Sequence, residues 1–219
     1  MSTQAQLAIL AAVTYFVGAI PFGLLVAKAK GRDPRQFGSG NIGTTNVGRM
    51  LGGKFFAIVF TLDMLKGMLP MLAGAFLVRH LDVTHKPYLI WMLVGLAALV
   101  GHIFPIYLKF KGGKGVATAA GVLLGLFPYY TIPGAIVIVL FIVVFLIWRM
   151  VSLGSVIGAL AFAPAYAVVG YSLGWPITRE QLPLLIFAIV MSLLIVIKHK
   201  ANIKRILAGT EHAFRKSQK

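Results

Sequence analysis

The sequence predicts an all-α polytopic membrane protein that forms one integral membrane domain, residues 1–219. Of its 219 residues, 59% are hydrophobic and only 12% are charged, whereas soluble domains carry about 25% charged residues. Several apolar stretches approach the ~20 residues that cross a hydrocarbon core as a helix. The polar segments between these stretches are short, so we expect no separate soluble domain.

The apolar stretches define seven predicted spans. The first has no basic segment before it and no small-residue cleavage site after it, so we interpret it as a retained span and not as a signal peptide. Pro21 and Gly23 are expected to bend its inner end. In chain order the predicted spans are 7–26, 55–78, 88–103, 116–127, 132–148, 153–171 and 182–197.

The stretch 116–148 could be one span or two, and two short spans are the better interpretation. It holds about 33 residues, more than one helix needs across a ~30 Å core. Pro128 and Pro133, with two tyrosines between them, interrupt its middle. The segments that connect the seven spans are the loops 28–54, 79–87, 104–115, 128–131, 149–152 and 172–181, and a tail follows at 198–219.

The distribution of basic residues predicts the orientation. The chain has 21 Lys and Arg against 5 Asp and Glu, a net charge of +16. With seven spans and the amino terminus outside, 17 of the basic residues are cytoplasmic, 3 are outside and Lys66 is within the membrane. A six-span alternative would place either the loop 28–54 or the basic tail on the wrong side. We therefore predict a cytoplasmic carboxyl terminus, and we attribute the charge to the membrane surface and not to nucleic acid.

The first motif is Gly-Ser-Gly-Asn-Ile-Gly-Thr-Thr-Asn-Val-Gly-Arg at 38–49. Its first six residues match the dinucleotide pattern G-x-G-x-x-G, but that pattern requires a preceding strand and a βαβ unit, which a membrane span excludes. The glycines, the small polar side chains and Arg49 could instead wrap an oxyanion, with Arg49 as a bidentate clamp. The alternative is a flexible loop in which Arg49 only sets orientation. The predicted phosphate ligands here are Ser39, Gly40, Asn41, Thr45, Asn46 and Arg49.

The second motif is the segment 101–118, which holds three lysines, a histidine and the run Gly-Gly-Lys-Gly where an apolar helix begins. It lacks the Walker pattern of a P-loop. Free backbone N–H groups at a helix start, with glycines and a cation beside them, favour a phosphate-like anion. The alternative is ordinary positive-inside charge. The predicted contacts are Gly112, Gly113, Lys114 and Gly115, whereas Lys109 and Lys111 could face only headgroups.

Two further groups of polar residues are candidates with structural alternatives. Ser152 and Ser155 start the sixth span, where they could cap the helix or bind a phosphate. His199, Asn202 and Arg205 are spaced by three, so they share one helical face, either as a site or as a basic end on headgroups.

Within the membrane, Asp63 and Lys66 lie three residues apart and are expected to pair as a brace, with an ion or proton path as the alternative. His102 is either a ligand contact or a histidine hydrogen-bonded between helices.

What the sequence lacks narrows the chemistry. It contains no cysteine, no G-x-S-x-G nucleophile elbow and no paired carboxylates. No cluster of His, Asp and Glu resembles a metal site, so we predict neither a metal nor a cofactor. The histidine followed five residues later by an aspartate that marks the common soluble-face glycerolipid acyltransferases is also missing.

Taken in order, Gly-Ser-Gly-Asn-x-Gly-x-Thr-Asn-x-x-Arg, Gly-His-x-x-Pro with Phe-Lys-Gly-Gly-Lys-Gly-Val-Ala-Thr, and His-x-x-Asn-Ile-x-Arg resemble the bacterial acyl-phosphate:glycerol-3-phosphate acyltransferases of the PlsY type. The resemblance covers essentially the whole chain. It implies a seven-span enzyme of the bacterial inner membrane with its site facing the cytoplasm. The implied reaction transfers an acyl group from acyl phosphate to the sn-1 hydroxyl of glycerol 3-phosphate, giving lysophosphatidic acid and phosphate.

The resemblance also implies functional roles at matching positions: Ser39, Arg49, Lys114, Ser155, His199 and Asn202. Because acyl phosphate is an activated mixed anhydride, positioning and charge neutralisation could suffice without a protein nucleophile. The expected partners are the two phosphorylated substrates and membrane lipid, with the protein acting as a monomer. A rival hypothesis is a transporter of a phosphorylated solute, but transporter sites lie at mid-membrane and these motifs lie at one face.

Overall fold

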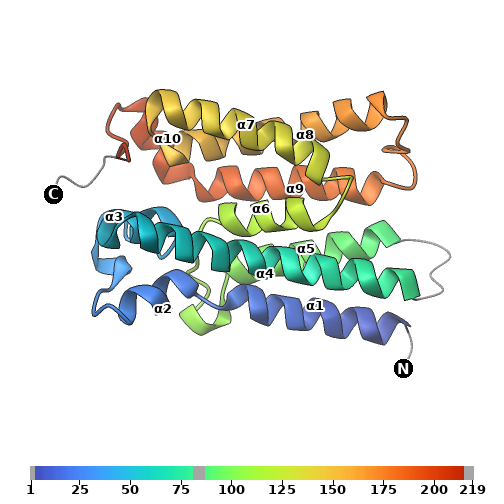
Figure 1. Ribbon diagram of the computed structural model, residues 1–219, viewed down its shortest axis with the longest axis horizontal. Coiled ribbons are helices and arrows are strands. Elements are labelled where there is room, and N and C mark those ends of the chain that lie inside the picture. Colours follow the sequence, from blue (N-terminus) through green and yellow to red (C-terminus); the bar gives the residue numbers. More distant parts are fainter. Residues whose placement is uncertain (1–2, 81–86, 215–219) are drawn as a thin grey trace.

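The structure is a computed structural model that describes residues 3–80 and 87–214, and every regular element in that part of the chain is helical (Figure 1). Most of the predicted loop 79–87 and the last residues of the tail, 215–219, lie outside the described residues. The helices are α1 Thr3–Ala19, α2 Phe22–Lys28, η1 Pro34–Gln36, α3 Thr44–Leu51, α4 Gly53–His80, α5 Pro87–Ile103, η2 Ile106–Leu108, α6 Val116–Gly125, α7 Thr131–Trp148, α8 Val151–Ser172, α9 Leu182–Lys198 and α10 Lys200–Leu207.

Five helical segments in the described ranges are long and apolar enough to cross a membrane. The pair α9 and α10, bent by 60° at His199, would make a sixth. The five segments are Ala8–Lys28, Gly53–Leu77, Tyr88–Leu108, Thr131–Trp148 and Val151–Ser172. The first span is interrupted where a bend was predicted, because α1 ends at Ala19 and α2 begins at Phe22 after Pro21.

The stretch 116–148 forms two helices, α6 and α7, as predicted, and α6 is short. Its ten residues span about 15 Å, half of a ~30 Å hydrocarbon core. Seven of these ten residues are buried, and at the carboxyl end of α6 Oγ1 of Thr131 donates to the carbonyl of Leu123 at 2.9 Å. Glycines bring α4 and α6 together: a Cβ on Gly121 would lie 1.9 Å from the backbone oxygen of Met64.

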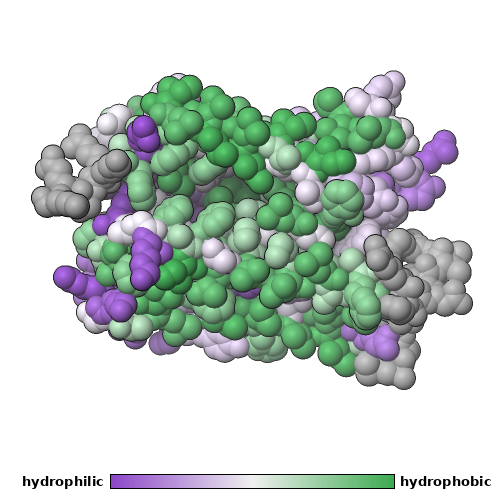
Figure 2. Space-filling model, in the orientation of Figure 1, coloured by the Kyte–Doolittle hydropathy of each residue, from purple (hydrophilic) through white to green (hydrophobic). Residues whose placement is uncertain are grey.

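The helices form two groups with α6 between them (Figure 1). α1, α4 and α5 make one group, and α7, α8 and α9 make the other. The core includes the buried rings of Tyr130, Phe162, Tyr166 and Phe187, and Tyr130 packs edge-on against Phe162 at 5.0 Å between ring centroids. Outward-facing residues are also apolar, as a lipid-exposed surface requires, and Figure 2 shows hydrophilic residues gathered mainly at the two ends.

The segments that were predicted to be cytoplasmic meet at one end of the bundle, on the left in Figure 1. Contacts between distant parts of the chain fix this end: Arg49 donates to the carbonyl of His212 at 2.7 Å, and the N–H of Phe214 donates to the carbonyl of Arg149 at 2.7 Å. The prediction of a loop throughout 28–54 is wrong at α3. That helix begins within the first motif, and Gly43 is its N-cap.

Candidate active site

A cavity of about 240 Å³ opens at this end of the bundle. It brings together side chains of all three motifs, from Ser39 in the first to Asn202 in the last. Ten of the predicted site residues line it: Ser39, Asn41, Thr45, Asn46, Arg49, Lys114, Gly115, Ser155, His199 and Asn202. Gly40, Gly112 and Gly113 do not line the cavity.

Three helices begin at the walls of this cavity. The first residues of α3, α6 and α8, which include Thr44, Val116 and Val151, all line it. The first N–H groups of a helix have no acceptor within it, and the helix dipole adds about half a positive charge there. The cavity is therefore suited to anions.

Asn46 holds the first motif in shape. Its buried side-chain amide donates to the carbonyls of Pro34, Phe37 and Asn41 at 2.8–2.9 Å and accepts from the N–H of Ser39 at 3.2 Å. An amide engaged in this way folds the loop and has no free donor for a ligand. Ser39 is thereby fixed at the cavity edge with its side chain exposed.

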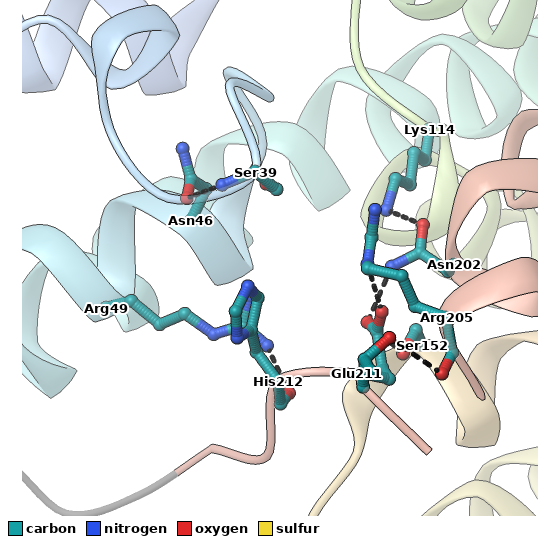
Figure 3. A network of polar contacts seen from close by, with 10 residues as sticks. Ser39, Asn46, Arg49, Lys114, Ser152, Asn202, Arg205, Glu211 and His212 are labelled. Carbon is teal, nitrogen blue, oxygen red and sulfur yellow. Dashed lines mark hydrogen bonds and ion pairs between the residues drawn. The ribbon is translucent and has the colours of Figure 1, made fainter. Parts of the chain in front are cut away.

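Arg49 and Lys114 reach the cavity from opposite sides (Figure 3). The Nε of Arg49 is buried and has no hydrogen-bond partner among the described residues. Lys114 Nζ hydrogen-bonds to Oδ1 of Asn202. Burial lowers the pKa of Lys114 to about 8, with Glu211 opposing the shift and Arg205 and Arg49 adding to it.

The glycines of the second motif have two structural roles: two of them form backbone hydrogen bonds, and the third is a helix N-cap. The N–H groups of Gly112 and Gly113 donate to the carbonyls of Ile103 and His102 at 3.2 and 3.1 Å, so they satisfy carbonyls at the end of α5 and are not free for a ligand. Gly115 is the N-cap of α6 with φ +85°, a conformation that other residues rarely adopt. A Cβ at this position would lie 2.7 Å from Cδ1 of Leu99.

The serines at the start of α8 do not cap it. Oγ of Ser155 donates to the carbonyl of Val151 at 2.7 Å, and Oγ of Ser152 donates to the carboxylate of Glu211 at 2.7 Å. Ser155 lines the cavity with its hydroxyl back-bonded along the helix, and it can turn toward a ligand only by giving up that bond.

Glu211 is the cavity residue that sequence reasoning missed. It is 7% exposed and accepts hydrogen bonds from Ser152, Asn202 and Arg205 at 2.6–2.7 Å (Figure 3). Burial alone would raise the pKa of this carboxyl, but the three hydrogen bonds lower it below its usual value. Its signal in the sequence was available, because it is the only acid in the basic tail.

The remaining walls are apolar or buried polar. Phe56, Phe60 and Phe141 supply aromatic surface from α4 and α7, and Figure 2 shows the molecule hollowed between these two helices. Asp63 and His102 line the deep end. Within the described residues, no group of three or more His, Cys, Asp or Glu side chains could hold a metal ion.

A bundle of apolar helices with a cationic cavity and an aromatic wall at one end defines an integral membrane protein for a ligand that is both anionic and lipid-like. Comparison with known proteins agrees with this class. The family model described as glycerol-3-phosphate acyltransferase matches residues 8–209.

Individual relatives match over nearly their whole length. The glycerol-3-phosphate acyltransferase of Geobacter sulfurreducens is 44% identical over 209 residues, 94% of this chain and 97% of that protein. The enzyme of Aquifex aeolicus is 40% identical over 202 residues, 91% of this chain and 95% of that protein. The crystal structure of PlsY, an integral membrane glycerol 3-phosphate acyltransferase, in its glycerol 3-phosphate form superposes with a TM-score of 0.81 at 37% identity over 96% of both chains.

The chain therefore belongs to the glycerol-3-phosphate acyltransferase family and is of the PlsY type. It is a multi-pass membrane acyltransferase of phospholipid biosynthesis. This assignment decides against the transporter hypothesis.

Proposed function

We propose that the protein transfers a fatty acyl group from acyl phosphate to the sn-1 hydroxyl of glycerol 3-phosphate, forming lysophosphatidic acid and phosphate. The observation that carries this proposal is the single cavity in which Arg49, Lys114, His199 and Asn202 meet beside an aromatic wall. Two phosphorylated substrates need cations on more than one side, and Arg49 and Lys114 reach the cavity from opposite sides.

In the proposed arrangement Arg49 and Lys114 hold the two phosphates. The unpartnered, buried Nε of Arg49 supports this role, because a buried guanidinium donor is costly unless a ligand satisfies it. Ser39 and Ser155 donate hydrogen bonds, as do the free N–H groups at the starts of α3 and α6. His199 and Asn202 orient glycerol 3-phosphate.

The reaction needs no covalent enzyme intermediate. The hydroxyl oxygen of glycerol 3-phosphate attacks the carbonyl carbon of acyl phosphate, and a new ester C–O bond forms. The bond from that carbon to the phosphate oxygen breaks, its electron pair leaves with the phosphate, and the hydroxyl proton ends on a phosphate oxygen. The cations and helix starts stabilise the negative charge that develops on the leaving group.

The acyl chain would lie along the aromatic surface of Phe56, Phe60 and Phe141, in a groove open to lipid. We also propose seven membrane passes, with α6 and the following turn as one incomplete pass enclosed by protein. The amino terminus would be outside and the site cytoplasmic, as the 17 inside and 3 outside basic residues favour. The enzyme would act as a monomer in the bacterial inner membrane.

The direct test supplies purified protein with acyl phosphate and glycerol 3-phosphate and measures both products. We expect lysophosphatidic acid and phosphate to appear in equal amounts, with the ester at the sn-1 position. Mass spectrometry of the protein during turnover is expected to show no acylated peptide. A trapped acyl-Ser39, or acylation only from a different donor, would contradict the proposal.

A further inference from the structure

A buried polar cluster lies directly behind the glycine-rich loop, and the proposed reaction assigns it no role. Asp63 and Lys66 on α4 form an ion pair with 2.8 Å between Oδ1 and Nζ, and both side chains are almost fully buried. His102, near the end of α5, is also buried, with its Nδ1 3.7 Å from the same Asp63 oxygen. The pairing that the sequence predicted for Asp63 and Lys66 is confirmed. Ionisable groups at membrane depth are costly and are usually functional.

The ion pair is also held in place by the break between the neighbouring helices α1 and α2. Lys66 Nζ also donates to the carbonyl of Ile20 at 2.9 Å, at the break between α1 and α2 where that oxygen has no regular helical partner. The ammonium neutralises the Asp63 carboxylate, which lines the cavity and would otherwise repel a phosphate. The side chain of Asp63 is therefore held in one position, and the ring of His102 lies next to it.

His102 connects this ion pair to the glycine-rich loop. Its carbonyl accepts the N–H of Gly113 at 3.1 Å, and its ring lies directly against that glycine, because a Cβ on Gly113 would be only 2.1 Å from Nε2. The next residue is Lys114, whose ammonium reaches Asn202 across the cavity. The imidazole ring thus determines where the loop that carries Lys114 lies relative to the cavity.

We propose that His102 is a positioning residue: its ring, backed by the Asp63–Lys66 ion pair, seats Gly113 and so fixes Lys114 for a substrate phosphate. The inference rests on the proposed phosphate-binding role of Lys114. It explains why glycine is required at 113 although its N–H is not free for a ligand. A shift of about 1 Å in a binding group can cost on the order of 100-fold, so a small change at the ring has a large effect.

The test measures kcat and the KM for each phosphorylated substrate in the wild type, His102→Asn, Lys114→Gln and the double variant. We expect Lys114→Gln to raise the KM for one substrate, and His102→Asn to raise that same KM by about 10-fold or more. The KM for the other substrate should change by less than about 2-fold in His102→Asn. The double variant should be no worse than Lys114→Gln alone, because the ring acts through that lysine.

The outcomes separate the two proposals. If Lys114→Gln raises a KM and His102→Asn does not, the positioning role is wrong and the phosphate-binding role stands. Effects that multiply in the double variant also overturn the positioning role. If Lys114→Gln raises neither KM, the phosphate-binding role fails and this inference fails with it.

A second variant tests the contact itself. Gly113→Ala forces its Cβ into the ring and should raise the same KM. Combining it with His102→Asn, which has a smaller side chain, should restore part of the loss, whereas a combined loss equal to the product of the two would contradict the contact. Tyr166→Phe is the matched control: it removes a buried 2.9 Å hydrogen bond to Gln181 away from the cavity, so it should lower thermal stability and leave both KM values unchanged.

Discussion

Replacing Lys114 by glutamine removes one cation from the cavity and keeps a side chain of similar length. A hydrogen bond to a charged group contributes about 1.5–3 kcal/mol, which corresponds to about a 10- to 150-fold loss in kcat/KM for the substrate whose phosphate Lys114 holds. We expect the upper half of this range, because Lys114 is largely shielded from water and its contacts are poorly screened. Lys111→Gln, an exposed lysine of the same loop, is the control and should change kcat/KM little.

The pH dependence gives the same prediction a second readout. Burial lowers the pKa of Lys114 to about 8, so the free enzyme holds the cation below that pH and loses it above. The wild-type kcat/KM should therefore fall as the pH rises through about 8, because this parameter reports the free enzyme. Lys114→Arg, which stays charged, should lack that decline. Initial rates of phosphate release between neutral and alkaline pH would measure both. A decline that persists unchanged in Lys114→Arg and Lys114→Gln would refute the reasoning.

Three further changes test the structure around the site, each by thermal unfolding in detergent. Gly115→Ala should destabilise by about 1–3 kcal/mol, since φ is +85° and the new Cβ would meet Leu99; an unchanged midpoint would argue against this geometry. Asn46→Ala should destabilise by about 1–3 kcal/mol for each backbone group left buried without a partner, whereas a wild-type midpoint would show that the loop folds without the amide. Glu211→Gln should destabilise at neutral pH, because the lowered pKa of Glu211 means that the ionised form supports the fold. That support is present above the usual glutamate pKa and disappears as the pH falls through the lowered one, so the variant and the wild type should converge in acid; a constant difference down to low pH would contradict it.

Hydropathy was sufficient to predict most of the membrane-spanning helices, because lipid requires long apolar helices. The break at Pro21 was also predictable, because proline lacks the backbone N–H that a continuous helix needs. Hydropathy did not predict α3, because a short helix beginning after glycine and threonine has the same composition as a loop. It did predict a short span at 116–127, only two residues longer than α6, because Pro128 ends the apolar run there.

For the site, the sequence identified Arg49, Lys114, His199 and Asn202 by residue type and spacing, and the structure brings all four to one cavity. It could not distinguish residues that face a ligand from residues that fold the loop. Asn46 and Gly113 belong to the motifs, but their donors bond to backbone carbonyls. Glu211 stands out as the only acid in the basic tail, but its hydrogen bond with Ser152 joins residues 59 apart, so the sequence did not show that it faces the cavity.

The polar end of the bundle is built from both halves of the chain, with Arg49 bonded to His212 and Lys114 bonded to Asn202. A ribosome synthesises these partners in order, so the cation of the first motif exists long before the residue that meets it. A nascent or prematurely terminated chain that ends before Asn202 can be inserted in the bilayer, but it lacks one wall of the cavity. We therefore expect a copy that is truncated before Asn202 to lack acyltransferase activity.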